Sequence, residues 1–596
     1  MACGRSDARP AEATSCSSNK SEPRVWVADD MERYASTGQR FPRPPSLDNA
    51  VWKPGGTVRL FGLPGETLGL QVLVRAGSAR LNSVTVDVDP GRGARWLSDR
   101  GTVSRFVPFE LPLSRRSGGV TPGESLGWER GLEPPLDSLG KSLPEPLIPI
   151  EVLANKGLYP IDIPSEQLRV VWIDLQIPTC GVTPGEYSAT LRVASGGRQL
   201  DEIFVLLQVG SGVLPYRASP TMLYFDPKEL IDRTGSPSSV AAYLQLVHRH
   251  QLSSIYPIVS ANDVDRFSQA LDGRLFTRAA EYGGPGEGVG ADVVALGAYG
   301  SLGEPSPAHL AQLDAILRRL ERLGITDRPG RTDVFLYAVD EACESSLPRQ
   351  WRLALAQSAS LRLSSLRVAQ SCDLPLQQQP VDLVLLPSSH YSPGDADRAK
   401  AHAKHVWIYN GALPYSGTFL SDAPLASMRI NPWIQARFGI ERWFYWESTF
   451  YNDDNPGGHG PFDPFATAET FHNRAGDHAN GDGVLVYPGR QPGFASNDWG
   501  FDGVIASERL KAWRRGIQDV GYVRLAATVD PERTSAITAL VVGRALDRAK
   551  AGAFPPFIGY PERFERARRL LFDIIQSGIS RLPKEAPREC APRVDP

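Results

Sequence analysis

The chain has 596 residues, of which 41% are hydrophobic and 22% are charged, and its formal net charge is −3 at pH 7. One hydrophobic core rarely organises so long a chain, so we expect several domains. The small net charge and the lack of a Lys/Arg-rich block argue against a nucleic acid as the main partner. No run of 18 apolar residues occurs, so the sequence predicts no membrane-spanning helix.

The N-terminus reads Met1-Ala2-Cys3-Gly4 and continues as a Ser- and Ala-containing stretch without periodicity to about Pro23. A lipidated cysteine followed by a flexible stretch is typical of a mature bacterial lipoprotein. We therefore expect residues 1–23 to be a tether and the protein to be exported, either periplasmic or on the surface, with lipidated Cys3 as a membrane anchor. A wrongly assigned start or an expression scar would give the same pattern.

Residues 24–212 predict a β-sandwich domain, because short segments with period-two alternation follow one another between turn residues. The insertion at 118–149 is rich in Pro and Gly, and we expect it to be a loop that packs over a neighbour. The predicted strands are 57–61, 67–74, 81–88, 168–173, 185–193 and 203–209.

Residues 213–506 change to an alternation of strands and helices, which predicts a (β/α)8 TIM-type barrel. A doubly wound open sheet would also alternate, but no Gly-rich phosphate fingerprint follows any strand. The eight predicted strands are 221–225, 254–259, 293–298, 333–340, 366–371, 381–387, 405–410 and 443–447. The predicted helices are 238–250, 261–271, 307–323, 348–361, 395–403 and 432–438.

Residues 507–581 predict a helical segment that packs on the barrel, with helices at 507–527, 533–551 and 561–577, and residues 582–596 predict a disordered tail. The predicted fold class is thus a multidomain β plus α/β protein, with an N-terminal β-sandwich, a barrel and C-terminal helices. The six cysteines form no CxxC pair, so we expect neither a zinc site nor a disulfide framework. Cys343 and Cys372 follow successive predicted strands, and we expect them to be ordinary buried thiols.

Asp340 and Glu341 stand together at the end of the apolar run 334–339, where a barrel strand would present catalytic groups. Most enzymes that cleave a glycosidic bond use two catalytic carboxylates of different pKa. Adjacent residues are poorly placed to flank that bond from opposite sides, so the pair suits substrate-assisted cleavage better. An Asp-Glu pair that caps the next helix is the alternative, because acids favour helix N-termini.

The order of a β-sandwich, a barrel with Tyr-x-x-Asp-Glu and an aromatic eighth strand resembles glycoside hydrolase family 123 and its wider bacterial relatives with a C-terminal region of unknown function. The resemblance extends from about residue 25 to 525, and the helix has Gln518-Asp519 where the family often has two acids. It implies a retaining, substrate-assisted exo-β-N-acetylhexosaminidase, similar to β-N-acetylgalactosaminidases, with Asp340 stabilising the acetamido group and Glu341 as acid/base. The segments that carry it are Tyr337–Glu341, Trp407–Asn410, Arg442–Glu447, Gly483–Gly489 and Ser507–Asp519.

Aromatic and polar residues near the ends of the predicted strands are the candidates for sugar stacking and hydroxyl recognition: Tyr337, Tyr409, Asn410, Tyr445, Trp446 and Glu447. The Gly-rich loop at 451–459 could be flexible, contact substrate or bind calcium, although it lacks EF-hand spacing. We expect no cofactor and no metal, and the expected partner is a carbohydrate substrate, a 2-acetamido glycan or glycoconjugate. The alternative function is a non-catalytic carbohydrate-binding or cell-surface protein built on a glycosidase-derived barrel.

Overall fold

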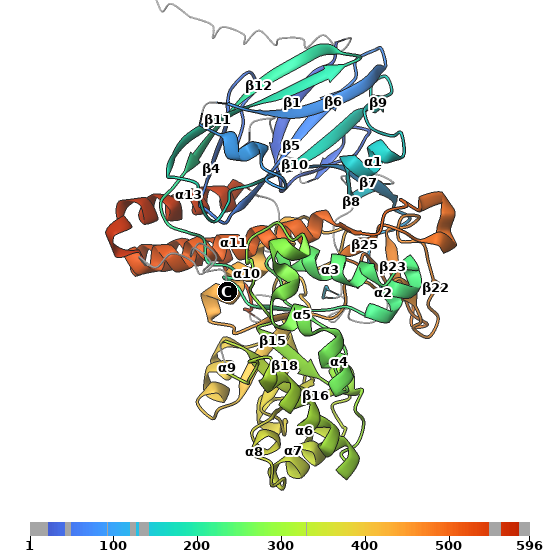
Figure 1. Cartoon of the computed structure of the whole chain (residues 1–596), viewed down its shortest axis with the longest axis vertical. Helices are drawn as coiled ribbons and strands as arrows, with labels where there is room; N and C mark the ends of the chain where they lie inside the picture. Colours follow the sequence, from blue (N-terminus) through green and yellow to red (C-terminus); the bar gives the residue numbers. More distant parts are fainter. Residues whose placement is uncertain are drawn as a thin grey trace, which may run out of the picture.

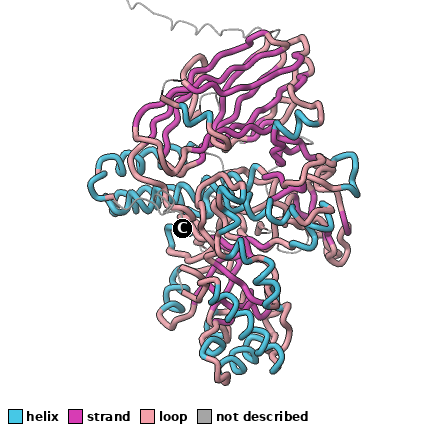
Figure 2. Tube along the Cα trace, in the orientation of Figure 1, coloured by secondary structure: helices cyan, strands magenta, loops and turns pink. Residues whose placement is uncertain are grey.

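The computed structural model describes residues 22–41, 49–91, 93–119, 127–129, 142–328, 331–547 and 562–582. A β-sandwich lies at one end, C-terminal helices cross the middle, and the barrel lies at the other end (Figures 1 and 2). The predicted fold class is therefore confirmed. The predicted anchor at Cys3 lies outside the described residues, and so do residues 583–596 of the tail predicted at 582–596. None of the described helices is long and apolar enough to cross a bilayer.

Two five-stranded sheets form the sandwich, in the orders β1-β5-β10-β7-β8 and β4-β12-β11-β6-β9. Alternate residues of each strand face the shared core, as in β11, where Tyr187, Ala189, Leu191 and Val193 are buried. The strands of the first sheet are Arg24–Asp29, Thr67–Arg75, Leu168–Gln176, Val103–Pro112 and Ser142–Pro149. Those of the second are Val58–Gly62, Arg198–Val209, Gly185–Ser195, Leu81–Pro90 and Ile161–Ile163.

The prediction of a loop over 118–149 is wrong at the C-terminal end of this range, where β8 pairs with β7 in antiparallel register. The strand was not predicted because it contains three prolines, which are rare inside a sheet. However, β8 lies at the edge of its sheet, where proline is tolerated. Within the described part of the insertion, Trp128 is buried and pairs with Leu413 beyond the seventh barrel strand. The insertion thus packs over a neighbour, as predicted.

Eight parallel strands form the barrel wall in the order β14-β13-β20-β19-β18-β17-β16-β15, and a bridge between Ile258 and Leu296 nearly closes the ring. Each strand coincides with one of the eight predicted strands. In chain order they are β13 Thr221–Tyr224, β14 Ser254–Ile255, β15 Val293–Leu296, β16 Asp333–Asp340, β17 Arg367–Ser371, β18 Leu383–Pro387, β19 His405–Tyr409 and β20 Trp443–Tyr445.

Helices connect most of these strands, although only a 3-10 turn separates β17 from β18. The prediction missed α2 and placed the start of α10 six residues too late, because Pro432 was read as a first helical residue. The described α-helices of the barrel are α2 Pro227–Thr234, α3 Ser238–Arg249, α4 Ala261–Arg266, α5 Ser268–Leu271, α6 Pro307–Arg322, α7 Leu347–Ala356, α8 Leu361–Ser364, α9 Pro393–Lys400 and α10 Ala426–Phe438.

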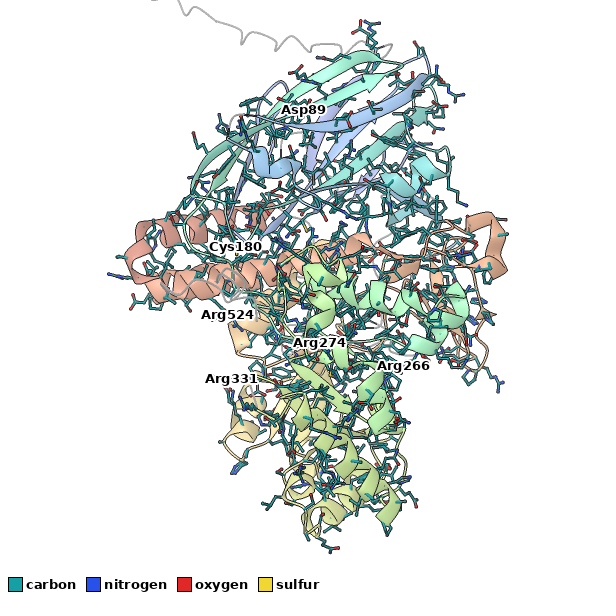
Figure 3. The ribbon with its side chains drawn as sticks, viewed as in Figure 1. Asp89, Cys180, Arg266, Arg274, Arg331 and Arg524 are labelled. Carbon is teal, nitrogen blue, oxygen red and sulfur yellow. A yellow bond between two sulfur atoms is a disulfide. The ribbon has the colours of Figure 1, made fainter. Side chains whose placement is uncertain are left out.

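The C-terminal helices are α11 Glu508–Val529, α12 Pro531–Val542 and α13 Glu562–Ser577; residues 548–551 of the second predicted helix lie outside the described part. Side chains fill the space between these helices and the sandwich (Figure 3). Helix α11 is buried along most of its length and carries several charged side chains. Such charges are tolerated in a protein interior only when they are paired.

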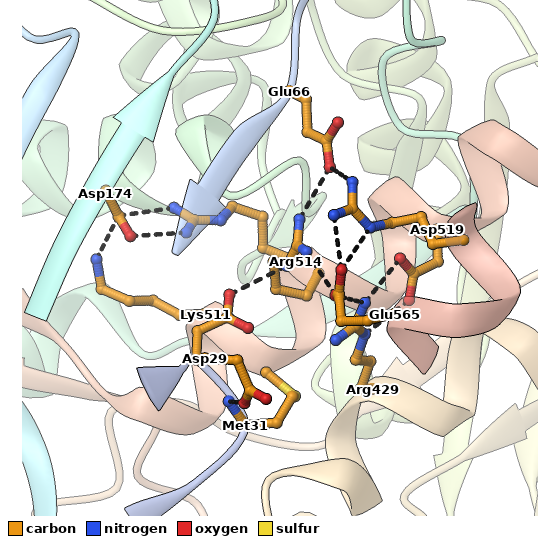
Figure 4. Close-up of polar contacts among 12 residues, drawn as sticks. Asp29, Met31, Glu66, Asp174, Arg429, Lys511, Arg514, Asp519 and Glu565 are labelled. Atoms are coloured by element: carbon orange, nitrogen blue, oxygen red, sulfur yellow. Dashed lines mark hydrogen bonds and ion pairs between the residues drawn. The ribbon is translucent and has the colours of Figure 1, made fainter. Parts of the chain in front are cut away.

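Buried ion pairs join α11 to the sandwich and to the barrel (Figure 4). Asp174 of β10 accepts from Lys511 at 2.5 Å and from Arg514 at 3.0 Å. Burial alone would raise the pKa of Asp174, but these two cations hold it well below its ordinary value. On the barrel side, Asp519 accepts from Arg429 of α10 at 2.7 Å. The sandwich and the barrel are therefore fixed to opposite sides of one helix.

Candidate active site

The carboxyl ends of the barrel strands present a group of polar side chains at the mouth of the barrel. Strand β16 ends at Asp340, and Glu341 follows with a left-handed φ of +49°. This conformation costs an L residue about 1–2 kcal/mol, so neighbouring contacts must hold it. The Glu341 N–H donates to the carbonyl oxygen and to Oγ of Ser371, both at 3.0 Å. The turn after β16 is thus anchored to the end of β17.

One carboxylate oxygen of Asp340 accepts hydrogen bonds from two hydroxyl groups. Tyr337 Oη donates to Asp340 Oδ1 at 2.8 Å, and Ser371 Oγ donates to the same atom at 2.5 Å. Tyr337 lies three residues earlier on the barrel interior, next to a β-bulge between Tyr337 and Val339, and Ser371 ends the neighbouring strand. Because Oδ1 is occupied, Oδ2 is the oxygen that Asp340 offers to an incoming donor.

Glu341 has a different environment. Its Oε1 accepts from Tyr409 Oη at 2.5 Å, across the barrel mouth from β19. Burial raises the pKa of Glu341, the Tyr409 hydrogen bond lowers it, and the nearby charges of Asp340 and Asp373 raise it further. The net direction is upward, which favours the protonated form that a general acid needs near neutral pH.

Asn410 and Glu447 lie at the ends of the seventh and eighth strands. Asn410 has a φ of +52°, and its Oδ1 accepts from the Trp446 N–H at 3.3 Å. Glu447 is buried, and its Oε1 accepts from Ser448 N, Thr449 N and Thr449 Oγ1 at 2.7–2.9 Å. Burial nevertheless raises the pKa of Glu447 well above its ordinary value.

Tyr445 and Trp446 form hydrogen bonds to a different acid, Asp482. Both donate to Asp482 Oδ1 at 3.1 Å, and the Tyr445 ring stacks on Phe419 with 4.1 Å between centroids. Strand alternation explains the position of Tyr445, because Phe444 is the β20 side chain that faces the barrel interior. The structure therefore groups Tyr337, Asp340, Glu341 and Tyr409, and it does not bring Tyr445 to them.

Three residues that were not among the predicted site residues also line this region: Ser371, Tyr224 and Tyr299. Tyr299 has a φ of +58°, and its hydroxyl donates to the Trp446 carbonyl oxygen. Its ring lies 4.8 Å from Tyr224 and 5.3 Å from Tyr337 between centroids. Position alone could have identified two of them, since Ser371 ends a predicted strand and Tyr299 follows one directly.

Cys343 and Cys372 form a disulfide, so the expectation of ordinary thiols is wrong. Neighbouring parallel strands lie about 4.8 Å apart, so residues just beyond their ends can meet although 29 positions separate them in sequence. Within the described ranges, the only group that could hold a metal ion is these two cysteines with Asp373, and the sulfurs are bonded to each other.

The loop that follows the eighth strand is built around a buried acid. Asp453 accepts from Asn455 Nδ2, from His459 N and from His472 N, at 2.9–3.1 Å. A short hairpin, β21 Asn452–Asp453 with β22 Gly460–Pro461, completes it. The carboxylate that a calcium loop would offer is thus engaged with the protein itself.

Comparisons with known proteins bear on the family and the fold of the chain. Residues 321–526 match the family model of the glycoside hydrolase 123 catalytic domain. A solved family 123 glycoside hydrolase from Clostridium perfringens, described in a study of glycolipid glycan hydrolysis, is 11% identical and has a TM-score of 0.63, covering 94% of this chain and 99% of that chain. A family 39 glycoside hydrolase from Bacteroides cellulosilyticus is 10% identical, with a TM-score of 0.26, and covers 64% of this chain and 76% of that chain. No curated protein matches.

Proposed function

We propose that the chain, which carries a glycoside hydrolase family 123 catalytic domain, is a retaining exo-β-N-acetylhexosaminidase that acts by substrate assistance, with β-linked N-acetylgalactosamine as the preferred sugar. One observation carries the proposal: two adjacent carboxylates at the end of β16 have separate supports, hydroxyls of Tyr337 and Ser371 for Asp340 and the hydroxyl of Tyr409 for Glu341. Adjacent acids do not suit the flanking geometry of the two-carboxylate mechanisms.

In the first step, the carbonyl oxygen of the 2-acetamido group attacks the anomeric carbon. The bond to the leaving oxygen breaks, and that oxygen takes the proton of Glu341. Asp340 accepts a hydrogen bond from the acetamido N–H and stabilises the positive charge of the cyclic oxazolinium. In the second step, water attacks the anomeric carbon and gives its proton to Glu341, and the ring opens. Two inversions at one carbon retain its configuration.

The other polar and aromatic side chains near the barrel mouth would position the sugar. We assign hydroxyl recognition to Asn410 and Glu447 at the ends of the last two strands, and ring contact to Trp446, which is only half buried. Tyr337 and Tyr409 would act mainly through the carboxylates that they hold, and Tyr445 through Asp482. Glycolipid glycans are a natural class to test, because the structurally similar clostridial enzyme is described in that context.

Release of nitrophenol from β-GalNAc and β-GlcNAc aryl glycosides tests the proposal. We expect turnover of the GalNAc substrate and a first-formed product with the β configuration by NMR. An N-trifluoroacetyl substrate should react much more slowly, because fluorine withdraws electron density from the attacking oxygen. An α product, or equal rates for both acyl groups, would contradict substrate assistance. No turnover of any acetamido glycan, together with measurable glycan binding, would support a non-catalytic binding protein instead.

We also propose that Cys3 is lipidated and tethers an exported enzyme, with residues 1–23 as the spacer. The Cys343–Cys372 disulfide supports export, since disulfides persist mainly in oxidising compartments. Fractionation of cells that express the full-length gene tests the tether. Membrane-associated protein that Cys3→Ser releases is the expected result, and cytosolic protein unaffected by Cys3→Ser would contradict it.

A further inference from the structure

The disulfide lies directly beside the carboxylate pair. Cys343 is two residues after Glu341, and Cys372 is one residue after Ser371, with 5.4 Å between the two Cα atoms. The disulfide therefore connects the turn after β16 to the end of β17, the same two segments that the hydrogen bonds of Ser371 join.

The turn after β16 has few other supports. Three of its residues, Ala342, Glu344 and Ser346, are exposed, so this part of the turn buries little side-chain surface. Its internal hydrogen bonds run between near neighbours, such as Cys343 N to the Glu341 carbonyl oxygen at 3.1 Å. Bonds of this kind do not fix a turn relative to the rest of a protein. A covalent link to β17 does so.

Cys372 is well suited to be the fixed end of the link. It is buried, its N–H donates to the Leu385 carbonyl oxygen of β18 at 3.2 Å, and its carbonyl oxygen accepts from Gln379 Nε2 at 3.1 Å. Cys343 is only partly buried and belongs to the exposed turn. The disulfide thus fastens a weakly supported segment to a rigid one.

We propose that the Cys343–Cys372 disulfide is a positioning element that holds Glu341 in its left-handed conformation, with its carboxyl group directed at the leaving-group oxygen. Neither cysteine touches the substrate or the reacting atoms in this role. The effect on rate rests on the proposed function, whereas the effect on the conformation of the turn does not. Reduction should lower catalysis while leaving the fold intact, because β16 and β17 remain paired through their own ladder.

Kinetics of the oxidised and reduced full-length protein test the proposal. Displacement of a catalytic group by about 1 Å costs up to ~10²-fold in rate, so we expect kcat on an unactivated glycoside to fall roughly 10- to 100-fold on reduction. The KM should change little, and a nitrophenyl glycoside should suffer less because its leaving group needs little protonation. This dependence on the leaving group is a readout that a merely structural role would not move. Reoxidation should restore the rate.

Two variants serve as matched controls. Cys343→Ser with Cys372→Ser should have the low kcat of the reduced enzyme and should not respond to reductant. Replacement of the other four cysteines, Cys3, Cys16, Cys180 and Cys590, by Ser should leave the response in place. Thermal unfolding and near-UV circular dichroism should show that each variant remains folded.

Hydrogen–deuterium exchange separates this inference from the proposed function. Reduction should speed amide exchange in peptides that cover 339–347 and leave peptides of β18 and β19 unchanged, whether or not a substrate is turned over. Full kcat after complete reduction, confirmed by thiol titration, would overturn this inference and leave the proposed function intact. Unchanged exchange at 339–347 would overturn it even in an inactive protein. Free thiols with stoichiometric zinc in the purified protein would overturn it as well.

Discussion

The Tyr409 hydroxyl donates to Glu341 Oε1 over 2.5 Å, and this bond joins the seventh barrel strand to the acid that follows the fourth. Burial raises the pKa of Glu341, whereas the hydrogen bond from Tyr409 opposes that rise by stabilising the carboxylate. The nearby charge of Asp373 acts in the opposite direction and raises the pKa. Two neighbours therefore tune the same acid with opposite signs.

Substitution of these neighbours should move the pH profile in opposite directions. A general acid must be protonated, so kcat/KM falls as the pH rises through the pKa of Glu341. Tyr409→Phe removes a bond that lowers this pKa, so the basic limb should shift to higher pH. Asp373→Asn removes a charge that raises the pKa, so the limb should shift to lower pH. Profiles of kcat/KM on an unactivated substrate measure both shifts, and a shift of the same sign in both variants would contradict the assignment.

Glu341→Gln should remove protonation of the leaving group. A general acid typically contributes about 10²–10⁴-fold, so we expect a loss of that size on unactivated glycosides. An aryl substrate with an acidic phenol should lose less, because its departure needs little protonation. Comparison of kcat/KM across phenols of increasing pKa measures the effect. An equal loss on every leaving group would show that Glu341 is not the acid.

Asp340→Asn should slow good and poor leaving groups alike, because Asp340 acts on the acetamido group and not on the departing oxygen. The asparagine keeps the shape of the side chain but lacks the negative charge that stabilises the oxazolinium. We expect a loss of at least about 10²-fold, similar to the removal of one charge-stabilising donor elsewhere. Ser371→Ala should cause a smaller loss of rate than Asp340→Asn, since it removes only one of the two hydroxyls that donate to Oδ1. If the loss of rate in Asp340→Asn depended steeply on the leaving group, Asp340 and not Glu341 would be the residue that protonates the leaving oxygen.

Local patterns were sufficient to predict the strands of the barrel, because buried parallel strands are short apolar runs between turn residues. The end of β16 at Asp340 was predicted to the residue. The side-chain supports could not be predicted in the same way. Ser371 and Tyr409 reach the carboxylates from other strands, and the disulfide links the turn after β16 to the end of β17. Their positions depend on strand order and on left-handed residues such as Glu341. A pattern within one segment contains neither kind of information.

The pairing of Asp174 with Lys511 and Arg514 should be a main contribution to the stability of the sandwich–helix contact. All three side chains are at most 9% exposed, so Asp174→Ala would leave two buried cations without a carboxylate partner. Removal of one member of a buried ion pair costs about 3–5 kcal/mol, and we expect a loss of that size in the free energy of unfolding. Asp162→Ala is the matched control, because its partner Arg80 is 57% exposed and the denaturation midpoint should hardly change.

The loss caused by Asp174→Ala should also depend on pH. Because the folded pKa of Asp174 lies below its unfolded pKa of about 3.9, its contribution is complete above that value and disappears as the pH falls through the folded pKa. Urea titrations should therefore show a difference between the wild type and the variant that shrinks below about pH 4. A difference that stays constant into acid, or that grows there, would mean that Asp174 does not stabilise the fold as a charged partner of α11.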